Sequence, residues 1–165
     1  MNITFAPRGI LQIDDARIVH RNFAGAPSKF NREGDRNFSV VIPDEATADK
    51  LMNDVNGYGV GWNVKIKPPR DEDDTPFIYL PVKIKFNNNG PAVYLRTNGK
   101  MVPLNEDTIA CLDDVDILSV DMDIRPYDDE FNGRAFRSAY LHSICVTQNV
   151  DRHMARYAAE EGPCE

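Results

Sequence analysis

Two chemistries alternate along the segment Phe77-Ile78-Tyr79-Leu80-Pro81-Val82-Lys83-Ile84-Lys85-Phe86. Successive side chains of a β-strand point to opposite faces, so the segment predicts a strand that buries an unbroken apolar row and exposes Phe77, Tyr79, Lys83 and Lys85. Exposed rings that stack on bases, beside ammonium groups that meet phosphates, are typical of surfaces that bind single-stranded nucleic acid. An ordinary solvated face stays open as the alternative, because outward aromatic and lysine residues also occur on plain antiparallel strands.

Two further segments, 62–67 and 93–96, repeat this alternation. Their outward cationic and aromatic residues would be Lys65, Lys67, Tyr94 and Arg96, while Trp62 would point into the core. If consecutive antiparallel strands carry these residues, their outer faces merge into one surface, which strengthens the hypothesis of single-strand binding.

The segment 21–38 is a second candidate region, because Gly and Pro make it a loop that is rich in cationic and aromatic residues. Phe30 or Phe23 would stack on a base while the loop cations follow the phosphates. Alternatively, Phe23 and Phe38 belong to the core and the charged residues are merely solvated. The full set of predicted nucleic-acid contacts is Arg21, Lys29, Phe30, Arg32, Arg36, Lys65, Lys67, Phe77, Tyr79, Lys83, Lys85, Tyr94 and Arg96.

The rest of the chain is dominated by segments that resemble strands. They lie at 9–23, 36–42, 61–67, 76–86, 91–97, 115–127 and 134–147. One clear helix is expected at 44–55 with Asp44 as its N-cap, and the turn residues at 87–90, 98–99 and 128–133 predict hairpins. We therefore expect a mainly β fold, an OB-fold-like antiparallel barrel with one inserted helix and long β-hairpin extensions. This nucleic-acid-binding domain would cover residues 1–150, and residues 151–165 would form a C-terminal tail, either a short helix or disordered.

The composition is that of a soluble single-domain protein. The chain has 165 residues, 42% of them hydrophobic and 27% charged. No apolar run approaches the roughly 20 residues of a membrane helix, and the N-terminus lacks the pattern of a secretory signal, so we expect an intracellular protein without membrane contact.

The net charge of −7 is unevenly distributed along the chain. Residues 1–100 hold 14 Lys or Arg against 12 Asp or Glu, whereas residues 101–165 hold 5 against 14. Phosphate attraction acts locally, because charges are screened within about 10 Å at moderate salt. A basic face can therefore bind DNA on a protein that is acidic overall.

Catalytic and metal-binding patterns are weak. The histidines and cysteines show no metal-ligand spacing, and the chain has no phosphate-cradling GK[ST] loop, nucleophile elbow or CxxC motif. Asp121 and Asp123 share an exposed strand face and could hold Mg²⁺ for nuclease chemistry, but no further ligand or base is identifiable. We expect a protein that is not an enzyme and that uses no cofactor or metal.

Several runs resemble a group of small single-stranded DNA-binding proteins encoded by bacteriophages and prophages. These runs are 29–38, 61–65, 124–127 and 139–141, and the resemblance covers roughly residues 9–148. It implies a sequence-tolerant binder of single-stranded DNA (ssDNA) that acts in phage DNA replication, recombination or repair in the cytoplasm of a bacterial host. Phage or host replication and recombination proteins would be its protein partners. Arg125 and Tyr127 would either face the nucleic acid or brace the barrel.

The chain differs from this group at residues 157–165. These residues are only mildly acidic and lack the terminal aromatic residue with which such proteins recruit partners. An edge strand left open by the barrel could also pair two copies into a homo-oligomer. A second functional hypothesis uses the acidic C-terminal half. In that hypothesis the chain is an acidic β-rich phage interaction protein that binds a basic host protein or mimics DNA.

Overall fold

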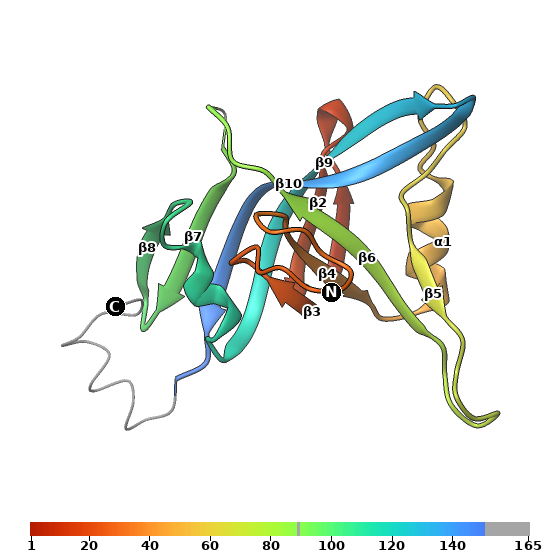
Figure 1. The fold of residues 1–165 in the computed structure, drawn as a ribbon. Helices are drawn as coiled ribbons and strands as arrows, with labels where there is room; N and C mark the ends of the chain where they lie inside the picture. The colour runs from red at the N-terminus through yellow and green to blue at the C-terminus, as the bar shows by residue number, and fades with distance from the viewer. Residues whose placement is uncertain (89, 151–165) are drawn as a thin grey trace.

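The computed structural model describes residues 1–88 and 90–150 (Figure 1). The strands are β1 (Asn2–Phe5), β2 (Leu11–Ala16), β3 (Ile18–Asn22), β4 (Arg36–Ile42), β5 (Lys65–Lys67), β6 (Phe77–Ile84), β7 (Ala92–Thr97), β8 (Lys100–Leu104), β9 (Ile117–Phe131) and β10 (Arg134–Gln148). The α-helix is α1 (Glu45–Asn53), and two short 3₁₀ helices are η1 (Pro7–Gly9) and η2 (Ile109–Asp113). The predicted tail at 151–165 lies outside the described residues.

All ten strands belong to one curved sheet. Its order is β1-β2-β9-β10-β6-β4-β3, with β5 added to β6 and with β7 and β8 added beside β10. Inward side chains from six of these strands meet in one core, where Leu11, Val40, Leu80, Leu95, Ile124 and Val146 have no exposed surface. The predicted mainly β architecture with one inserted helix is confirmed. Within the described residues the sheet stays open, ending at β1 and at β3.

Strand β10 changes its partners along its length. It pairs antiparallel with β9, and in parallel first with β6, where Tyr140 lies opposite Lys83, and then with β7 from Ser143 to Thr147. β6 and β7 therefore follow each other along the same edge of β10, and the hairpin predicted at 87–90 is wrong. Because β6 and β7 follow each other along one edge of β10, both strands bury their apolar rows in the same core. The hairpin predicted at 98–99 does form, between β7 and β8.

The segment predicted as one strand at 9–23 is divided into β2 and β3. Asp15 has a left-handed φ of 54° inside a register shift of the pairing between β2 and β9, which ends at Ala16, and from Ile18 onward the chain pairs with β4. The two partners are not neighbours, because β10 and β6 lie between them in the sheet order.

Helix α1 begins as predicted, because the Asp44 carboxylate accepts a hydrogen bond of 2.7 Å from the backbone N–H of Thr47. No helix in the described part of the chain has the length and apolar character needed to cross a membrane. After α1, Gly61 passes so close to the Met52 carbonyl that a side chain there would collide with it. This close approach places Trp62 in the core as predicted, with 2% of its surface exposed.

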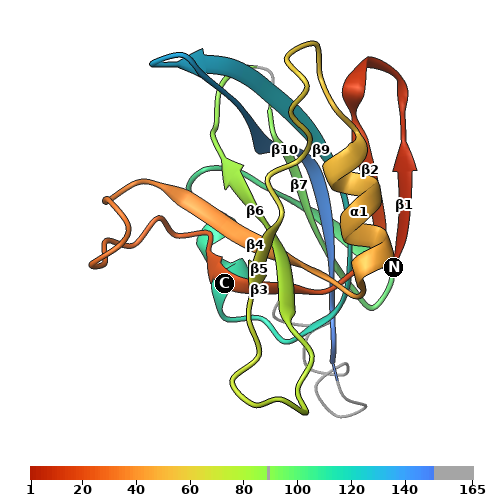
Figure 2. The same ribbon diagram turned by 90° about the vertical axis from the view of Figure 1, so that its right-hand side faces the viewer.

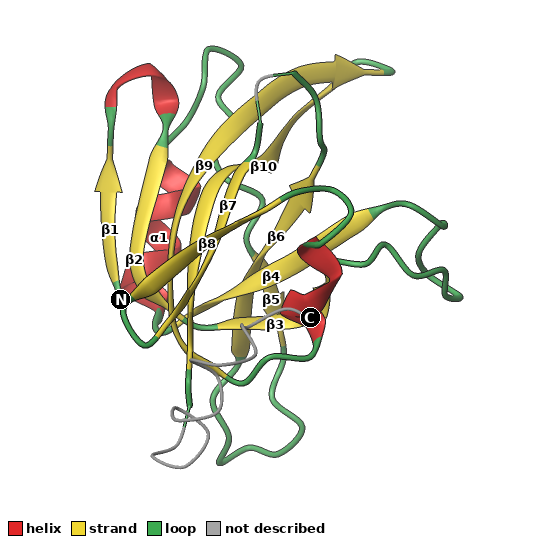
Figure 3. Cartoon of the chain, turned by 90° about the vertical axis from the view of Figure 1, so that its left-hand side faces the viewer, coloured by secondary structure: helices red, strands yellow, loops and turns green. Residues whose placement is uncertain are grey.

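Strands β9 and β10 form a hairpin that is longer than predicted, because their pairing continues to Phe131 and Arg134. Its distal half projects past the sheet toward the loop that follows α1 (Figure 1). Strands β7 and β8 lie on the opposite side of the molecule from β5 and α1 (Figures 1 and 3).

Candidate nucleic-acid interface

The outer side of β6 carries the row that the alternation predicts. Its buried residues are Ile78, Leu80, Val82 and Ile84. The alternate residues face outward beside β5, which places Lys65 opposite Tyr79 and Lys67 opposite Phe77 (Figure 2). Ile66, expected to point inward, is 54% exposed because β5 is a three-residue edge strand.

Three rings from two strands pack together on this side. His20 of β3 lies edge-on to Phe77, at 6.2 Å between ring centroids, and to Tyr79, at 5.3 Å. Phe77 in turn stacks on Tyr79 at 5.4 Å. The Oγ of Ser39 on β4 lies 3.2 Å from Nδ1 of His20, a hydrogen bond that orients the imidazole across β4. The cluster presents aromatic surface next to the two lysines of β5.

A second group is centred on Tyr140 of β10, which stands between two cations. Lys83 lies opposite on β6, with its Nζ 5.9 Å from the ring centroid, and Arg125 lies opposite on β9, with its guanidinium carbon 4.9 Å from it. Tyr127 of β9 contacts Tyr140 at 5.9 Å and Phe136 at 6.4 Å between centroids. This group joins β6, β10 and β9 into one surface.

We call this surface the aromatic face. Its rings are His20, Phe77, Tyr79, Tyr127, Phe136 and Tyr140, and its cations are Lys65, Lys67, Lys83, Lys85 and Arg125. All of these side chains are at least partly exposed. Rings and cations alternate across five strands, an arrangement that can stack bases and pair phosphates together.

The loop 23–35 is ordered by its own polar side chains. Asn31 donates from Nδ2 to three backbone carbonyls, those of Ala26, Arg32 and Asp35, each at 3.0 Å. The loop leaves β4 next to Asn37, which pairs with Lys83 of β6. It therefore projects from the end of β6 that carries Lys83.

The tip of this loop presents three of the predicted contacts to solvent. Phe30 is 92% exposed, and the Nζ of Lys29 lies 5.7 Å from its ring centroid. Arg32 is equally exposed and forms a loose ion pair of 3.7 Å with Asp35. Such an exposed pair contributes little to stability, so Arg32 remains able to turn toward a phosphate.

Two other predicted contacts in this region are engaged inside the protein. Arg21 donates from Nη1 to the carbonyls of Leu112 and Val115 at 2.9 and 2.7 Å. Arg36, 19% exposed, donates from Nε to a loop carbonyl at 3.0 Å and forms an ion pair of 3.5 Å with Glu106. Arg21 thus ties β3 to the segment 112–115, and Arg36 ties the start of the loop to Glu106, so we leave both out of the binding surface proposed below.

Phe23 and Phe38 belong to the core, as the alternative interpretation of this segment holds. Their rings stack at 5.2 Å between centroids, and neither is more than 1% exposed. The carboxylate of Asp113 accepts hydrogen bonds from the backbone N–H groups of Phe23 and Ala24 at 2.7 and 3.0 Å. These contacts fix the start of the loop.

Strand β7 places the last two predicted contacts in a different sector. Tyr94 lies opposite Cys145 and Arg96 lies opposite Thr147 of β10, farther along this strand than Tyr140. Tyr94 lines a shallow hollow together with Asp14, Asp121 and Asp123. These carboxylates would repel phosphates. We therefore leave Tyr94 and Arg96 out of the aromatic face, and their contact with nucleic acid stays a prediction.

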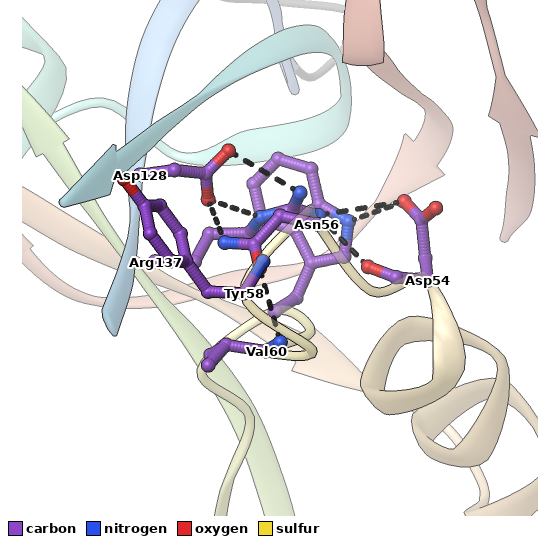
Figure 4. A network of polar contacts seen from close by, with 7 residues as sticks. Asp54, Asn56, Tyr58, Val60, Asp128 and Arg137 are labelled. Carbon is purple, nitrogen blue, oxygen red and sulfur yellow. Dashed lines mark hydrogen bonds and ion pairs between the residues drawn. The ribbon is translucent and has the colours of Figure 1, made fainter. Parts of the chain in front are cut away.

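A buried arginine fixes the hairpin that carries Tyr127 and Phe136. Arg137, 8% exposed, donates from Nε to Oδ1 of Asp128 at 2.7 Å and from Nη1 to the Asp54 carbonyl at 2.9 Å (Figure 4). Its guanidinium carbon lies 5.0 Å from the centroid of the Trp62 ring. The charge is thus paired and hydrogen-bonded, which is the condition for burying it without a large penalty.

Asn56 completes this network from the loop that follows α1. Its Nδ2 donates to Oδ1 of Asp128 at 2.8 Å, while its own Oδ1 accepts from the backbone N–H groups of Tyr58 and Val60 at 2.8 and 3.1 Å (Figure 4). Burial disfavours the ionised form of Asp128, but the hydrogen bonds from Arg137 and Asn56 outweigh it and lower the pKa of this carboxyl below its ordinary value. The ionised network ties the hairpin to the body of the protein.

Sequence reasoning missed His20, Phe136 and Tyr140. Phe136 and Tyr140 alternate with the buried Ala139 and Leu141, so the same two-residue period could have found them. No local signal identifies His20, because its place on the aromatic face depends on β3, β4 and β6 lying side by side. Arg125 and Tyr127, whose role the sequence leaves open, both contact Tyr140.

The chain matches a family model described as "Putative phage ssDNA-binding domain" over residues 3–161. The chain belongs to this family. The match spans nearly all of the sequence and confirms the resemblance to phage single-strand binders. A comparison with curated protein sequences gives no match.

Solved structures of the single-stranded DNA-binding protein from bacteriophage Enc34 share the fold of this phage ssDNA-binding domain. A C-terminally truncated form and a complex with ssDNA each align with a TM-score of 0.54 and 15% identity, covering 91% of this chain and 92% of that chain. A further structure of the Enc34 protein aligns with a TM-score of 0.55 and 12% identity, covering 91% and 87%. At this identity the likeness establishes the fold.

Proposed function

We propose that this phage ssDNA-binding domain holds single-stranded DNA, with little sequence preference, on its aromatic face. The observation that carries the proposal is the position of Tyr140 between Lys83 and Arg125. A base stacked on this ring has a cation on either side for its flanking phosphates. Stacking tolerates any sequence because every base has a π face.

The proposed contacts fall into two classes. The stacking residues are Phe30, Phe77, Tyr79 and Tyr140, and the phosphate contacts are Lys29, Arg32, Lys65, Lys67, Lys83, Lys85 and Arg125. Tyr127 and Phe136 extend the surface along the hairpin. Because the rings come from different strands, the strand of DNA would bend over the curved sheet instead of following one β-strand.

The biological role that suits this surface is protection of exposed strands during phage DNA replication, recombination or repair, in the cytoplasm of the bacterial host. The family description, which names phage and ssDNA, supports this role. We propose a binder without catalytic activity. In the described residues, no group of three or more His, Cys, Asp or Glu side chains lies close enough to hold a metal ion for nuclease chemistry. Contacts with replication or recombination proteins, or with a second copy of the chain, are further proposals.

Fluorescence anisotropy of a labelled oligo-dT of about 30 nucleotides tests the proposal, with a duplex of the same length as control. We expect single-strand binding that is tighter than duplex binding. It should weaken with salt, since each phosphate contact contributes about −0.7 to the slope of log K against log salt concentration. Absence of single-strand binding at low salt, or equal binding of the duplex, would contradict the proposal.

A further inference from the structure

A hollow of about 350 Å³ lies where β10 changes its parallel partner from β6 to β7. β6 pairs with β10 at Tyr140, and β7 pairs with it only from Ser143 onward. The ladder between β9 and β10 also shifts its register between Leu141 and Ser143, around His142. The edge of β10 is covered here by the connection between β6 and β7 instead of by a strand, and this leaves the hollow.

The chemistry of the hollow favours an anion. Lys85 and Arg125 line it together with His142, and none of its described lining residues is Asp or Glu. It adjoins the aromatic face directly, because Arg125 also contacts the ring of Tyr140 at 4.9 Å. Its volume lies at the lower end of the roughly 300–1,000 Å³ typical of small-ligand pockets, which suits a single nucleotide unit.

The two cations of the hollow differ from the structural arginines of this protein. Arg21, Arg36 and Arg137 all donate to carbonyl or carboxylate groups of the protein. The side chains of Lys85 and Arg125, by contrast, make no hydrogen bond or ion pair with another residue in the described parts of the chain. Their N–H donors are therefore available for a phosphate, and two cations that line one hollow without an acidic partner favour one.

We propose that this hollow is a phosphate subsite of the ssDNA site. One phosphodiester group of the strand lies between Lys85 and Arg125, and the adjacent base stacks on Tyr140. The inference rests on the proposed function and deepens it. It names the point at which a phosphate of the DNA enters a hollow of the sheet, whereas the rest of the DNA lies across the surface.

The first test compares Lys85→Ala with Lys100→Ala in the anisotropy assay. Both variants remove one exposed lysine, but Lys100 lies on β8, away from the aromatic face. We expect Lys85→Ala to weaken binding of the oligo-dT at least about fivefold at low salt and to reduce the salt slope by about 0.7, while Lys100→Ala leaves both unchanged. Equal effects of the two variants would overturn the subsite, because they would show a general charge effect.

The second test locates the contact by NMR on isotopically labelled protein. Inorganic phosphate and thymidine 5′-monophosphate should shift the backbone amides of Gly90, Leu141 and His142, thymidine without phosphate should not, and Arg125→Gln should abolish these shifts. If oligo-dT shifts Tyr79 and Tyr140 but none of the three amides, the subsite is overturned and the proposed function stands. If oligo-dT shifts neither set, the proposed function itself fails.

Discussion

Tyr140 has its role because of the two strands that flank it. Pairing of β10 with β6 and with β9 brings Lys83 and Arg125 to opposite sides of its ring. A cation near a ring strengthens it as a platform for a base and at the same time supplies the charge that a phosphate needs. Tyr94 has the same alternating pattern in the sequence, but Asp121 and Asp123 are its neighbours.

This contrast makes a matched pair of variants. Tyr140→Ala should weaken binding of oligo-dT by about 1–3 kcal/mol, because one stacking platform is removed. Tyr94→Ala removes an exposed ring of the same kind outside the aromatic face and should leave the affinity unchanged. Anisotropy titrations of both variants, with circular dichroism to confirm folding, make the comparison. If Tyr94→Ala weakened binding of oligo-dT and Tyr140→Ala did not, the result would contradict the proposal that DNA binds on the aromatic face.

At the residue scale, sequence could predict what depends on the local period. The outward positions of Phe77 and Tyr79 and the buried position of Trp62 follow from alternation alone, and the structure has them so. The local period could not show that Arg21 and Arg36 contact other parts of the protein. Arg21 is engaged by Leu112 and Val115, and Arg36 forms an ion pair with Glu106, all far away in the sequence, and no periodicity reports such contacts.

The distal part of the β9–β10 hairpin depends on an element outside the sheet. Arg137 occupies the inward side of β10, where an apolar residue is expected, and its guanidinium pairs with Asp128 and lies against the Trp62 ring. Removing one partner of such a pair leaves a charge without compensation. The network therefore sets where Tyr127 and Phe136 stand relative to the rest of the aromatic face.

Arg137→Met tests this positioning role. We expect the free energy of unfolding to fall by about 2–3 kcal/mol, because charge-assisted hydrogen bonds are lost and Asp128 keeps its charge. We also expect weaker oligo-dT binding, since the hairpin loses its fixed orientation. Urea unfolding and anisotropy measure the two effects. Arg134→Met, at the exposed tip of the same hairpin, is the control and should change the stability little. Equal stabilities of the two variants would contradict the network.

The lowered pKa of Asp128 predicts an acid dependence of stability. A carboxyl with a depressed pKa in the folded state stabilises the fold fully above its ordinary value of about 3.9, and this contribution is lost as pH falls through the lower folded value. Asp128→Asn should therefore be less stable than the native chain at pH 7 and should lose less stability on acidification. Urea unfolding from pH 7 to pH 3 measures both, with Asp73→Asn in the exposed 71–74 loop as control. A parallel acid dependence in Asp128→Asn and the native chain would contradict the prediction.

At the element scale, the sequence predicted most strands and the helix but not how β6 connects to β7. Turn residues at 87–90 are compatible with a reversal, and nothing local reveals that β10, more than 40 residues later, offers one edge to both strands. The hollow of the proposed phosphate subsite arises from this long-range pairing, so it could not be predicted either.

Over the whole molecule, the cations gather at one part of the sheet, although Asp129 accepts a hydrogen bond of 3.0 Å from the Tyr127 hydroxyl on the aromatic face. The aromatic face gathers lysines and Arg125 from β5, β6 and β9, while Asp14, Asp121 and Asp123 lie near Tyr94. Some acidic residues of the C-terminal half serve inside the fold, since Asp113 and Asp128 accept hydrogen bonds that fix a loop and the hairpin. A net charge of −7 is thus compatible with a local surface for phosphates.

Hydrogen–deuterium exchange with and without oligo-dT of about 30 nucleotides is the most direct measurement of where this phage ssDNA-binding domain holds its ligand. We predict slower exchange on binding in peptides from 63–86 and 124–142, which cover β5, β6 and the distal hairpin, and no change in 92–104, which covers β7 and β8. Protection confined to 92–104, with the aromatic face unaffected, would contradict the account.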